Sequence, residues 1–165
     1  MLTLGVSIAI KRLEILQLFV NNIKKDKHIK TEGIFRIPAD TKTVDLYYNK
    51  FKESNYSSDY LKTILLIADT HDMVSLFKKL LFDNTIKESY FYPHITYEEI
   101  ETTLIDLSKY IVWKSYANKM DVAAITAVIA MQLQNINPKF KGMTEMEEAK
   151  QTKVFMEEIK RKIKS

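Results

Sequence analysis

The stretch TEGIFRIPAD, residues 31–40, decides how the fold is read, because it interrupts a chain whose pattern is otherwise helical. It holds Gly33, Arg36 and Pro38, and the whole chain contains only three residues of each of these types. Glycine lets a backbone turn sharply and proline stiffens it, so the stretch predicts a loop. Arg36 stands between two apolar residues, and we expect its planar cation either to be buried in an ion pair or to be directed at a partner.

Apolar residues recur at helical spacing on both sides of this loop. Local patterns also predict where helices begin: Asp40, Asp121 and either Asp69 or Asp72 are candidate N-caps, and Thr96 with Glu99 and Thr144 with Glu147 form capping boxes. The expected helices cover about residues 13–23, 44–51, 61–68, 73–81, 96–113, 122–133 and 144–163, with breaks at 54–58 and 135–142 and an irregular segment at 83–94. The sequence therefore predicts an all-α bundle of about seven to nine helices, in one domain spanning residues 1–165.

Composition narrows the class of protein. The 165 residues are 46% hydrophobic and 28% charged, which is typical of a globular domain. The absence of cysteine excludes disulfides, thiol catalysis and cysteine-ligated zinc. A net charge of +4 favours acidic partners in general and does not by itself indicate nucleic acid. No apolar run approaches the ~18 residues of a membrane span and no signal peptide opens the chain, so we expect a cytoplasmic protein.

Patterns typical of enzymes are missing from the sequence. The three histidines stand far apart without the spacing of metal ligands, and no glycine-rich phosphate loop or serine nucleophile motif is present. Tyr110, Trp113 and Tyr116 are expected in the core or at its rim and not as a platform for stacking bases. His71 is expected at the start of a helix and not as a general base.

Residues 30–38, KTEGIFRIP, resemble the arginine-finger loop of the Rho GTPase-activating (RhoGAP) domain family, which reads roughly T-E-G-[IL]-F-R-[VI]-x-G. Three further pieces resemble segments of that family in the same order along the chain. LGVSI at 4–8 resembles its opening F-G-V-P-L, MVSLFKKLL at 73–81 resembles its V-x-x-L-L-K-x-[FY]-L helix, and NKM at 118–120 resembles its N-K-M. The resemblance spans nearly the whole chain and implies an all-helical fold.

The resemblance implies a GTPase activator and not an enzyme that acts alone. Arg36 would be the arginine finger, supplied in trans to a Rho- or Rac-family small GTPase, and Gly33 would let its loop turn. Phe35 and Ile37 would anchor the loop in the core, leaving Arg36 to project. The partner would bring GTP, magnesium and a water-positioning glutamine, so the chain itself would need no cofactor and no metal.

The resemblance also implies contacts that bind the GTPase. Lys78 matches the lysine that holds the finger loop and touches the GTPase, and Lys79 takes that role if the register slips by one residue. Gln132 could offer an amide hydrogen bond from the late helix. The family further implies a monomeric domain of a longer chain, recruited to membranes by other domains and binding no nucleic acid.

Several positions depart from the family pattern. Phe82 replaces its second arginine, Ala124 and Gln132 stand where its late helix has asparagines, and Ala39 stands where its finger loop ends in glycine. These departures leave a second function open, in which the chain binds a small GTPase or another partner without stimulating hydrolysis. In a third interpretation the domain is unrelated and Arg36 is buried against a carboxylate.

Overall fold

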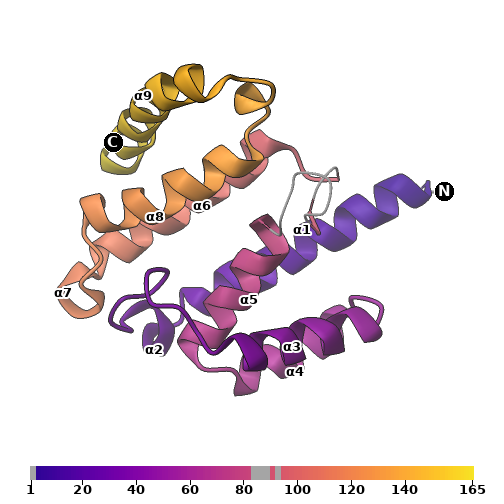
Figure 1. Ribbon diagram of the computed structural model, residues 1–165. Coiled ribbons are helices and arrows are strands. Elements are labelled where there is room, and N and C mark those ends of the chain that lie inside the picture. The colour runs from indigo at the N-terminus through magenta and orange to yellow at the C-terminus, as the bar shows by residue number, and fades with distance from the viewer. Residues whose placement is uncertain (1–2, 83–89, 92–93) are drawn as a thin grey trace.

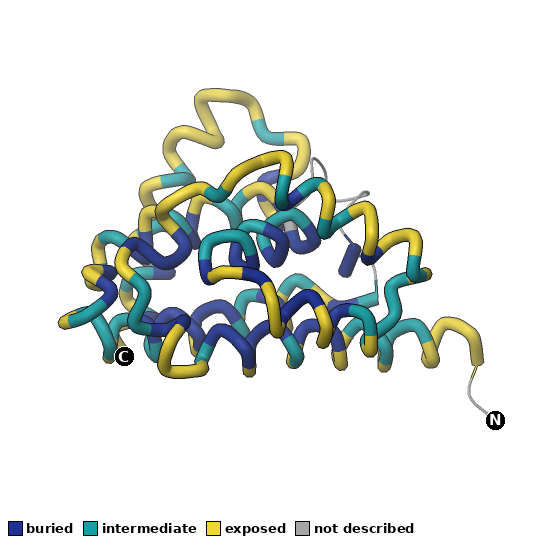
Figure 2. Tube along the Cα trace, turned by 90° about the horizontal axis from the view of Figure 1, so that it is seen from below, coloured by how far each residue is buried: buried dark blue, intermediate teal, exposed yellow. Residues whose placement is uncertain are grey.

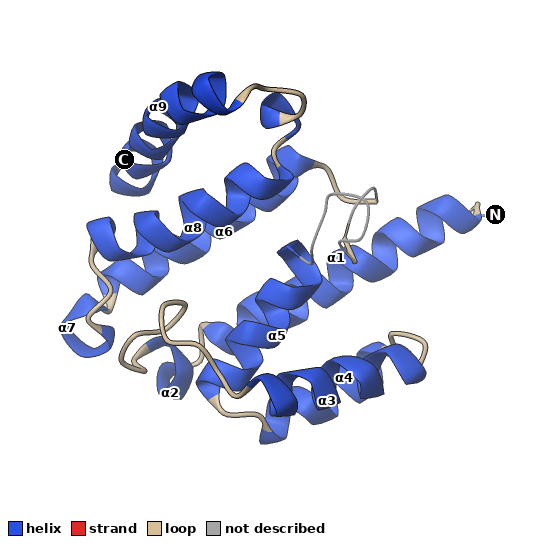
Figure 3. Cartoon of the chain, in the orientation of Figure 1, coloured by secondary structure: helices blue, strands red, loops and turns tan. Residues whose placement is uncertain are grey.

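A computed structural model describes residues 3–82, 90–91 and 94–165, apart from the side chain of Phe82. The segment expected to be irregular, 83–94, lies mostly outside these residues. The described residues form nine α-helices, one 3-10 helix and no strand (Figure 3). The elements are α1 (Leu4–Ile23), α2 (Asp26–Ile29), α3 (Thr41–Glu53), α4 (Ser58–Ile67), α5 (Thr70–Phe82), α6 (Tyr97–Trp113), α7 (Ser115–Asn118), α8 (Val122–Ile136), η1 (Pro138–Phe140) and α9 (Glu145–Lys164).

The helix starts follow the predicted capping residues. Asp40 caps α3 and Asp121 caps α8, each through a bond that its carboxylate accepts from a backbone N–H of the first turn. Thr96 and Thr144 open α6 and α9 with complete capping boxes. Of the two candidates at α5, Asp69 accepts the N–H three residues later at 2.8 Å. These side chains satisfy backbone donors that a helix start leaves without a partner.

Other boundaries differ from the prediction. Helix α1 begins at Leu4, well before the apolar pattern becomes regular, because Thr3 caps it. Helix α8 continues through Asn135 to Ile136, so the following loop begins later than predicted. Helices α2 and α7 were not predicted, since four residues are too few to show a helical period.

The helices form two groups, as Figure 1 shows. Helices α1, α3, α4 and α5 pack together, and helices α6, α8 and α9 form the second group. Contacts between α5 and α8 join the groups, and Figure 2 shows the buried residues on the inward faces of the helices. The first turns of α1 extend past the other helices (Figures 1 and 2). None of the described helices has both the length and the apolarity needed to cross a bilayer.

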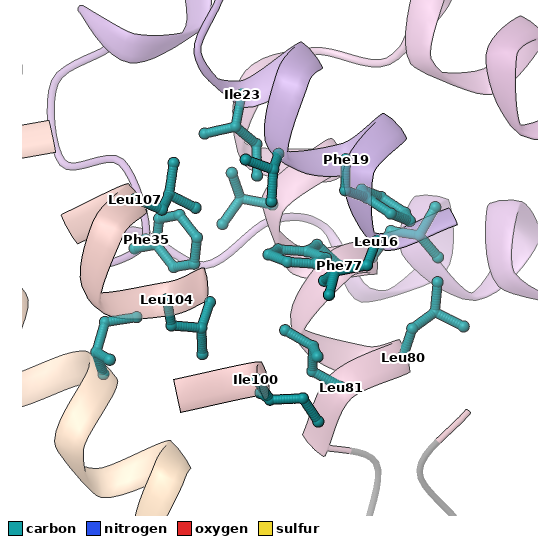
Figure 4. Packing of buried hydrophobic residues seen from close by; sticks show 14 of the residues in the cluster. Leu16, Phe19, Ile23, Phe35, Phe77, Leu80, Leu81, Ile100, Leu104 and Leu107 are labelled. Atoms are coloured by element: carbon teal, nitrogen blue, oxygen red, sulfur yellow. The ribbon is translucent and has the colours of Figure 1, made fainter. Parts of the chain in front are cut away.

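The centre of the core is aromatic. Phe77 of α5 stacks on Phe19 of α1 with ring centroids 5.0 Å apart, and it meets Phe35 edge-on at 6.4 Å. Figure 4 shows Phe35 beside Leu104 and Leu107 of α6. All five side chains are at most 1% exposed, so the loop that carries Phe35 is fixed to both groups of helices.

Candidate functional site

The stretch 31–40, here called the arginine loop, links α2 to α3 and is wound into tight turns. The N–H of Ile34 donates to Thr31 O at 3.2 Å, and the N–H groups of Arg36 and Ile37 both donate to Gly33 O, at 2.8 and 2.9 Å. These short-range hydrogen bonds curl the loop. Its side chains therefore do not alternate between two faces, as they would in an extended strand.

Because the loop is curled, its anchors differ from the prediction. Ile34 and Phe35 are both buried, at 0% and 1% exposure, although they are neighbours in the chain. Ile37, which we expected to share the anchoring with Phe35, is 37% exposed and instead covers Gly33. The expectation for Ile37 was therefore wrong, while Phe35 does enter the core.

The backbone of the loop is left-handed at two residues. Gly33 has φ +72°, which glycine adopts freely, but Phe35 has φ +71°, which is rare for a bulky side chain. Such a conformation costs on the order of 1–3 kcal/mol and persists only where the surroundings impose it. The loop therefore stores strain one residue before Arg36.

Lys78 is one of the contacts that impose this conformation. Its ammonium group donates a hydrogen bond to the backbone carbonyl of Phe35 and lies 5.8 Å from the centroid of the Phe35 ring. Burial lowers the pKa of Lys78 below its ordinary value, because the charged form loses hydration. Lys79 points elsewhere: its ammonium group lies 3.5 Å from the Asp45 carboxylate and over the Tyr48 ring. Of the two lysines, Lys78 is the one in contact with the arginine loop.

Asn118 is the second support of the loop, a role that the sequence did not predict. Its backbone carbonyl accepts the N–H of Gly33 at 2.8 Å. Its side chain is fully buried, donates to the carbonyls of Ile29 and Ile111 at 2.9 Å each, and accepts the N–H of Met120 at 2.8 Å. The only signal for it was the NKM match, which contained the residue without indicating its contact.

A chain of hydroxyl groups ties the start of the loop to α5. The Thr70 hydroxyl lies 2.7 Å from His28 Nδ1 and 3.0 Å from the Thr31 hydroxyl, which itself donates to Lys27 O at 2.9 Å. His28 is buried, and burial, reinforced by neighbouring lysines, lowers its pKa. The environment of His28 therefore favours the neutral form of its imidazole.

Arg36 is the side chain that the loop leaves free. It is exposed, and among the described residues no carboxylate forms an ion pair with it. Asp40 is engaged in capping α3, and Glu32 is exposed. One Arg36 guanidinium nitrogen lies 3.3 Å from the position that a Cβ atom at Gly33 would occupy, so the group rests over the turn. The burial of Arg36 against a carboxylate, which the third interpretation included, is contradicted by this exposure.

Gln132 does not join this group. It lies on α8, half-buried, and its Oε1 is buried without a hydrogen-bond partner among the described residues. Among the residues that the structure describes, no hydrogen bond connects Gln132 to the arginine loop, Lys78 or Asn118. The structure thus brings together Gly33, Arg36 and Lys78, and leaves Lys79 and Gln132 outside.

The charges near the exit of the loop are acidic. Burial raises the pKa of the Asp72 carboxyl, and the neighbouring charges of Asp69 and Asp40 raise it further. Asp40, Asp69 and Asp72 therefore form a small negative cluster. Over the described residues, no group of three histidine, aspartate or glutamate side chains is placed to hold a metal ion.

Comparison of the chain with family models, curated proteins and solved structures found no match in any of the three. The resemblance to the RhoGAP family therefore rests on the arginine loop and on the three other segments that occur in the same order.

Proposed function

We propose that this chain activates a small GTPase of the Rho or Rac type by supplying Arg36 to the partner's active site. The observation that carries the proposal is an exposed arginine, without an ion-pair partner in the described chain, on a loop held from both sides. Asn118 holds the loop at Gly33 and Lys78 holds it at Phe35. A loop fixed before binding loses less conformational entropy when it docks, and this supports a role in recognition or catalysis.

The chemistry of GTP hydrolysis suits this residue. Negative charge spreads over the transferring phosphoryl group and the leaving oxygen, and a planar, permanently charged guanidinium can bridge two of the oxygens. An arginine finger accelerates hydrolysis by about 10³–10⁵, which corresponds to roughly 4–7 kcal/mol of transition-state stabilisation. The partner would supply GTP, magnesium and the attacking water, so catalysis would take place on the GTPase.

Binding without stimulation is the second candidate, and a specific observation favours it. Gln132 stands where the resemblance places an asparagine, and its carbonyl oxygen is buried without a partner in the described chain. Phe82 stands where the family has its second arginine. A domain that kept the arginine loop and lost these groups would recognise a GTPase with little effect on its rate.

Single-turnover hydrolysis of GTP by a panel of Rho-family GTPases separates the two functions. The wild-type chain is compared with Arg36→Ala and Arg36→Lys, and Arg161→Ala serves as the control because Arg161 is an exposed arginine on α9. We expect the wild type and the control to accelerate one GTPase by a hundredfold or more and both Arg36 variants to lose this. Thermal unfolding of each variant checks that the fold is intact.

Binding to the GTP-loaded partner is measured in the same panel. A wild-type chain that binds one GTPase without accelerating hydrolysis is the second candidate, a recognition module. A chain that neither binds nor accelerates any member contradicts the first candidate, and it restricts the second to a partner outside the panel.

A further inference from the structure

Helices α1 and α6 end at one end of the molecule, where the short helices α2 and α7 also lie (Figure 1). These segments carry exposed and half-buried aromatic rings together with half-buried lysines. We call this group the aromatic–lysine patch; its members are Lys24, Lys30, Tyr110, Trp113, Lys114 and Tyr116. Trp113 is 66% exposed and Tyr116 is 65% exposed, whereas we expected core or rim positions. Two large rings left in water at one place indicate a contact surface.

Tyr110 and Trp113 contact each other, and each also contacts a lysine of the patch. The Lys114 ammonium lies 4.1 Å from the centroid of the Trp113 ring, and the Lys24 ammonium lies 5.5 Å from that of Tyr110. Tyr110 and Trp113 meet edge-on with centroids 5.4 Å apart. Lys24, Tyr110, Trp113 and Lys114 therefore form one cluster, and Lys30, whose ammonium lies 3.0 Å from the Asp26 carboxylate, is near Tyr116.

The positive charge of the chain is concentrated here. Residues 24–30 and 109–119 contain seven lysines and one aspartate, a net charge of +6, whereas the whole chain carries +4. The remainder of the molecule is thus slightly negative. A surface of this kind attracts a negatively charged partner over long range.

We propose that the aromatic–lysine patch binds an anionic lipid surface. Tryptophan and tyrosine favour the boundary between headgroups and acyl chains, where the ring is dehydrated and its polar edge stays wet. Lysines beside them reach the headgroups with flexible stems while their ammonium groups remain hydrated. A single-stranded nucleic acid fits less well, because a base would have to displace the Lys114 ammonium in order to stack on that face of Trp113.

This inference does not rest on Arg36 or on the proposed function. The patch is made of other residues and its readout involves no GTPase, so either proposal can fail while the other stands.

Trp113 is the chain's single tryptophan, so its fluorescence reports directly on the patch. The full chain is mixed with vesicles of phosphatidylcholine alone and with vesicles of an equal mixture of phosphatidylcholine and phosphatidylserine. With the mixed vesicles we expect co-sedimentation, a shift of the emission to shorter wavelength and quenching by brominated acyl chains. With phosphatidylcholine alone we expect neither binding nor a shift. Absence of binding to the mixed vesicles, or binding with unchanged emission, overturns the proposal.

A charge variant tests the lysines. The triple substitution Lys24→Gln, Lys30→Gln and Lys114→Gln should lower the partition into mixed vesicles by roughly a hundredfold, because each lysine near an anionic surface contributes about fivefold. Trp113→Ala, measured by sedimentation, should also weaken binding.

The matched control carries the same change of charge on another part of the surface. Lys139→Gln, Lys141→Gln and Lys153→Gln lie near η1 and on α9, and all three are exposed. We expect this control to bind almost as well as the wild type. A loss equal to that of the patch variant, or tighter binding to an oligonucleotide of mixed sequence than to the vesicles, overturns the assignment.

Discussion

Two features of the arginine loop require glycine at position 33: a left-handed backbone and the close approach of Ile37. Replacing each of the three glycines with alanine separates the cost of the two. Gly5 lies in α1 with an ordinary φ and no atom within 4 Å of an added Cβ. Gly142 has φ +82° and is equally open. Gly33 has φ +72°, and an added Cβ would lie 2.3 Å from Ile37 Cδ1 and 2.6 Å from Ile37 Cγ1. Alanine should therefore meet no obstacle at Gly5, an unfavourable backbone conformation at Gly142, and both this conformation and a steric clash at Gly33.

The magnitudes follow from these three environments. A left-handed conformation costs an L-residue about 1–2 kcal/mol, which applies to Gly142→Ala and Gly33→Ala alike. At Gly33 the Ile37 side chain must also leave its place, and crowding of this kind adds about 1–2 kcal/mol. We expect a loss of about 1–2 kcal/mol for Gly142→Ala and about 2–4 kcal/mol for Gly33→Ala. Gly5→Ala should be neutral or stabilising by up to about 1 kcal/mol, because alanine is the better helix former.

Urea unfolding followed by circular dichroism measures all three variants against the wild type. In thermal unfolding the same free energies correspond to roughly 2–4 °C per kcal/mol for a chain of this size. Equal losses for Gly33→Ala and Gly142→Ala would refute the reasoning, because Ile37 would then not cover the turn. A stabilising Gly33→Ala would refute the left-handed backbone as well.

Three further predictions concern the supports of the loop. Lys78→Met should lower the free energy of unfolding, measured in urea, by about 1–3 kcal/mol, because the Phe35 carbonyl loses its hydrogen-bond donor. Its control, Lys79→Met, removes a half-exposed ion pair and should cost less than about 1 kcal/mol. Asn118→Ala should cost about 3 kcal/mol or more in the same assay, because it breaks the buried hydrogen bonds of the Asn118 side chain. The control Asn135→Ala, at an exposed position, should cost less than about 0.5 kcal/mol, and similar losses for the two variants would contradict the buried network. Since burial lowers the pKa of His28, the unfolded state takes up the proton first as the pH falls below about 6.5, so stability should decline from there until the folded histidine is protonated too. His28→Gln should flatten this decline, and an unchanged pH profile of unfolding would show that another group causes it.

Short local patterns predicted most of the fold. A capping box needs only a threonine and a glutamate three residues apart, so Thr96 and Thr144 marked the starts of α6 and α9 correctly. The helical period carried the all-α prediction for the same reason, since each turn repeats within a few residues. Helices α2 and α7 were missed because each is too short to show a helical period.

The geometry of the candidate site depends on contacts between distant segments, and the sequence alone could not supply these. Lys78 was named because of a resemblance, but only the packing of α5 shows that it, and not Lys79, meets the loop. The bond from Gly33 to Asn118 joins two loops that only the fold brings together. The prediction failed at Ile37 because an extended chain would place Phe35 and Ile37 on one side, whereas the hydrogen bonds of the turn curl the backbone.

The same contacts explain what Arg36 does and does not do for the fold. The strained conformation at Phe35 is held by the core around its ring and by the hydrogen bond from Lys78 to its carbonyl, and neither involves the guanidinium. Arg36 is exposed and forms no ion pair in the described chain, so the fold gains little from its charge. The strain at Phe35 is therefore compensated by contacts within the chain, and the Arg36 guanidinium takes no part in them. Because the fold does not need this cation, a contact outside the chain is the place to test for its role.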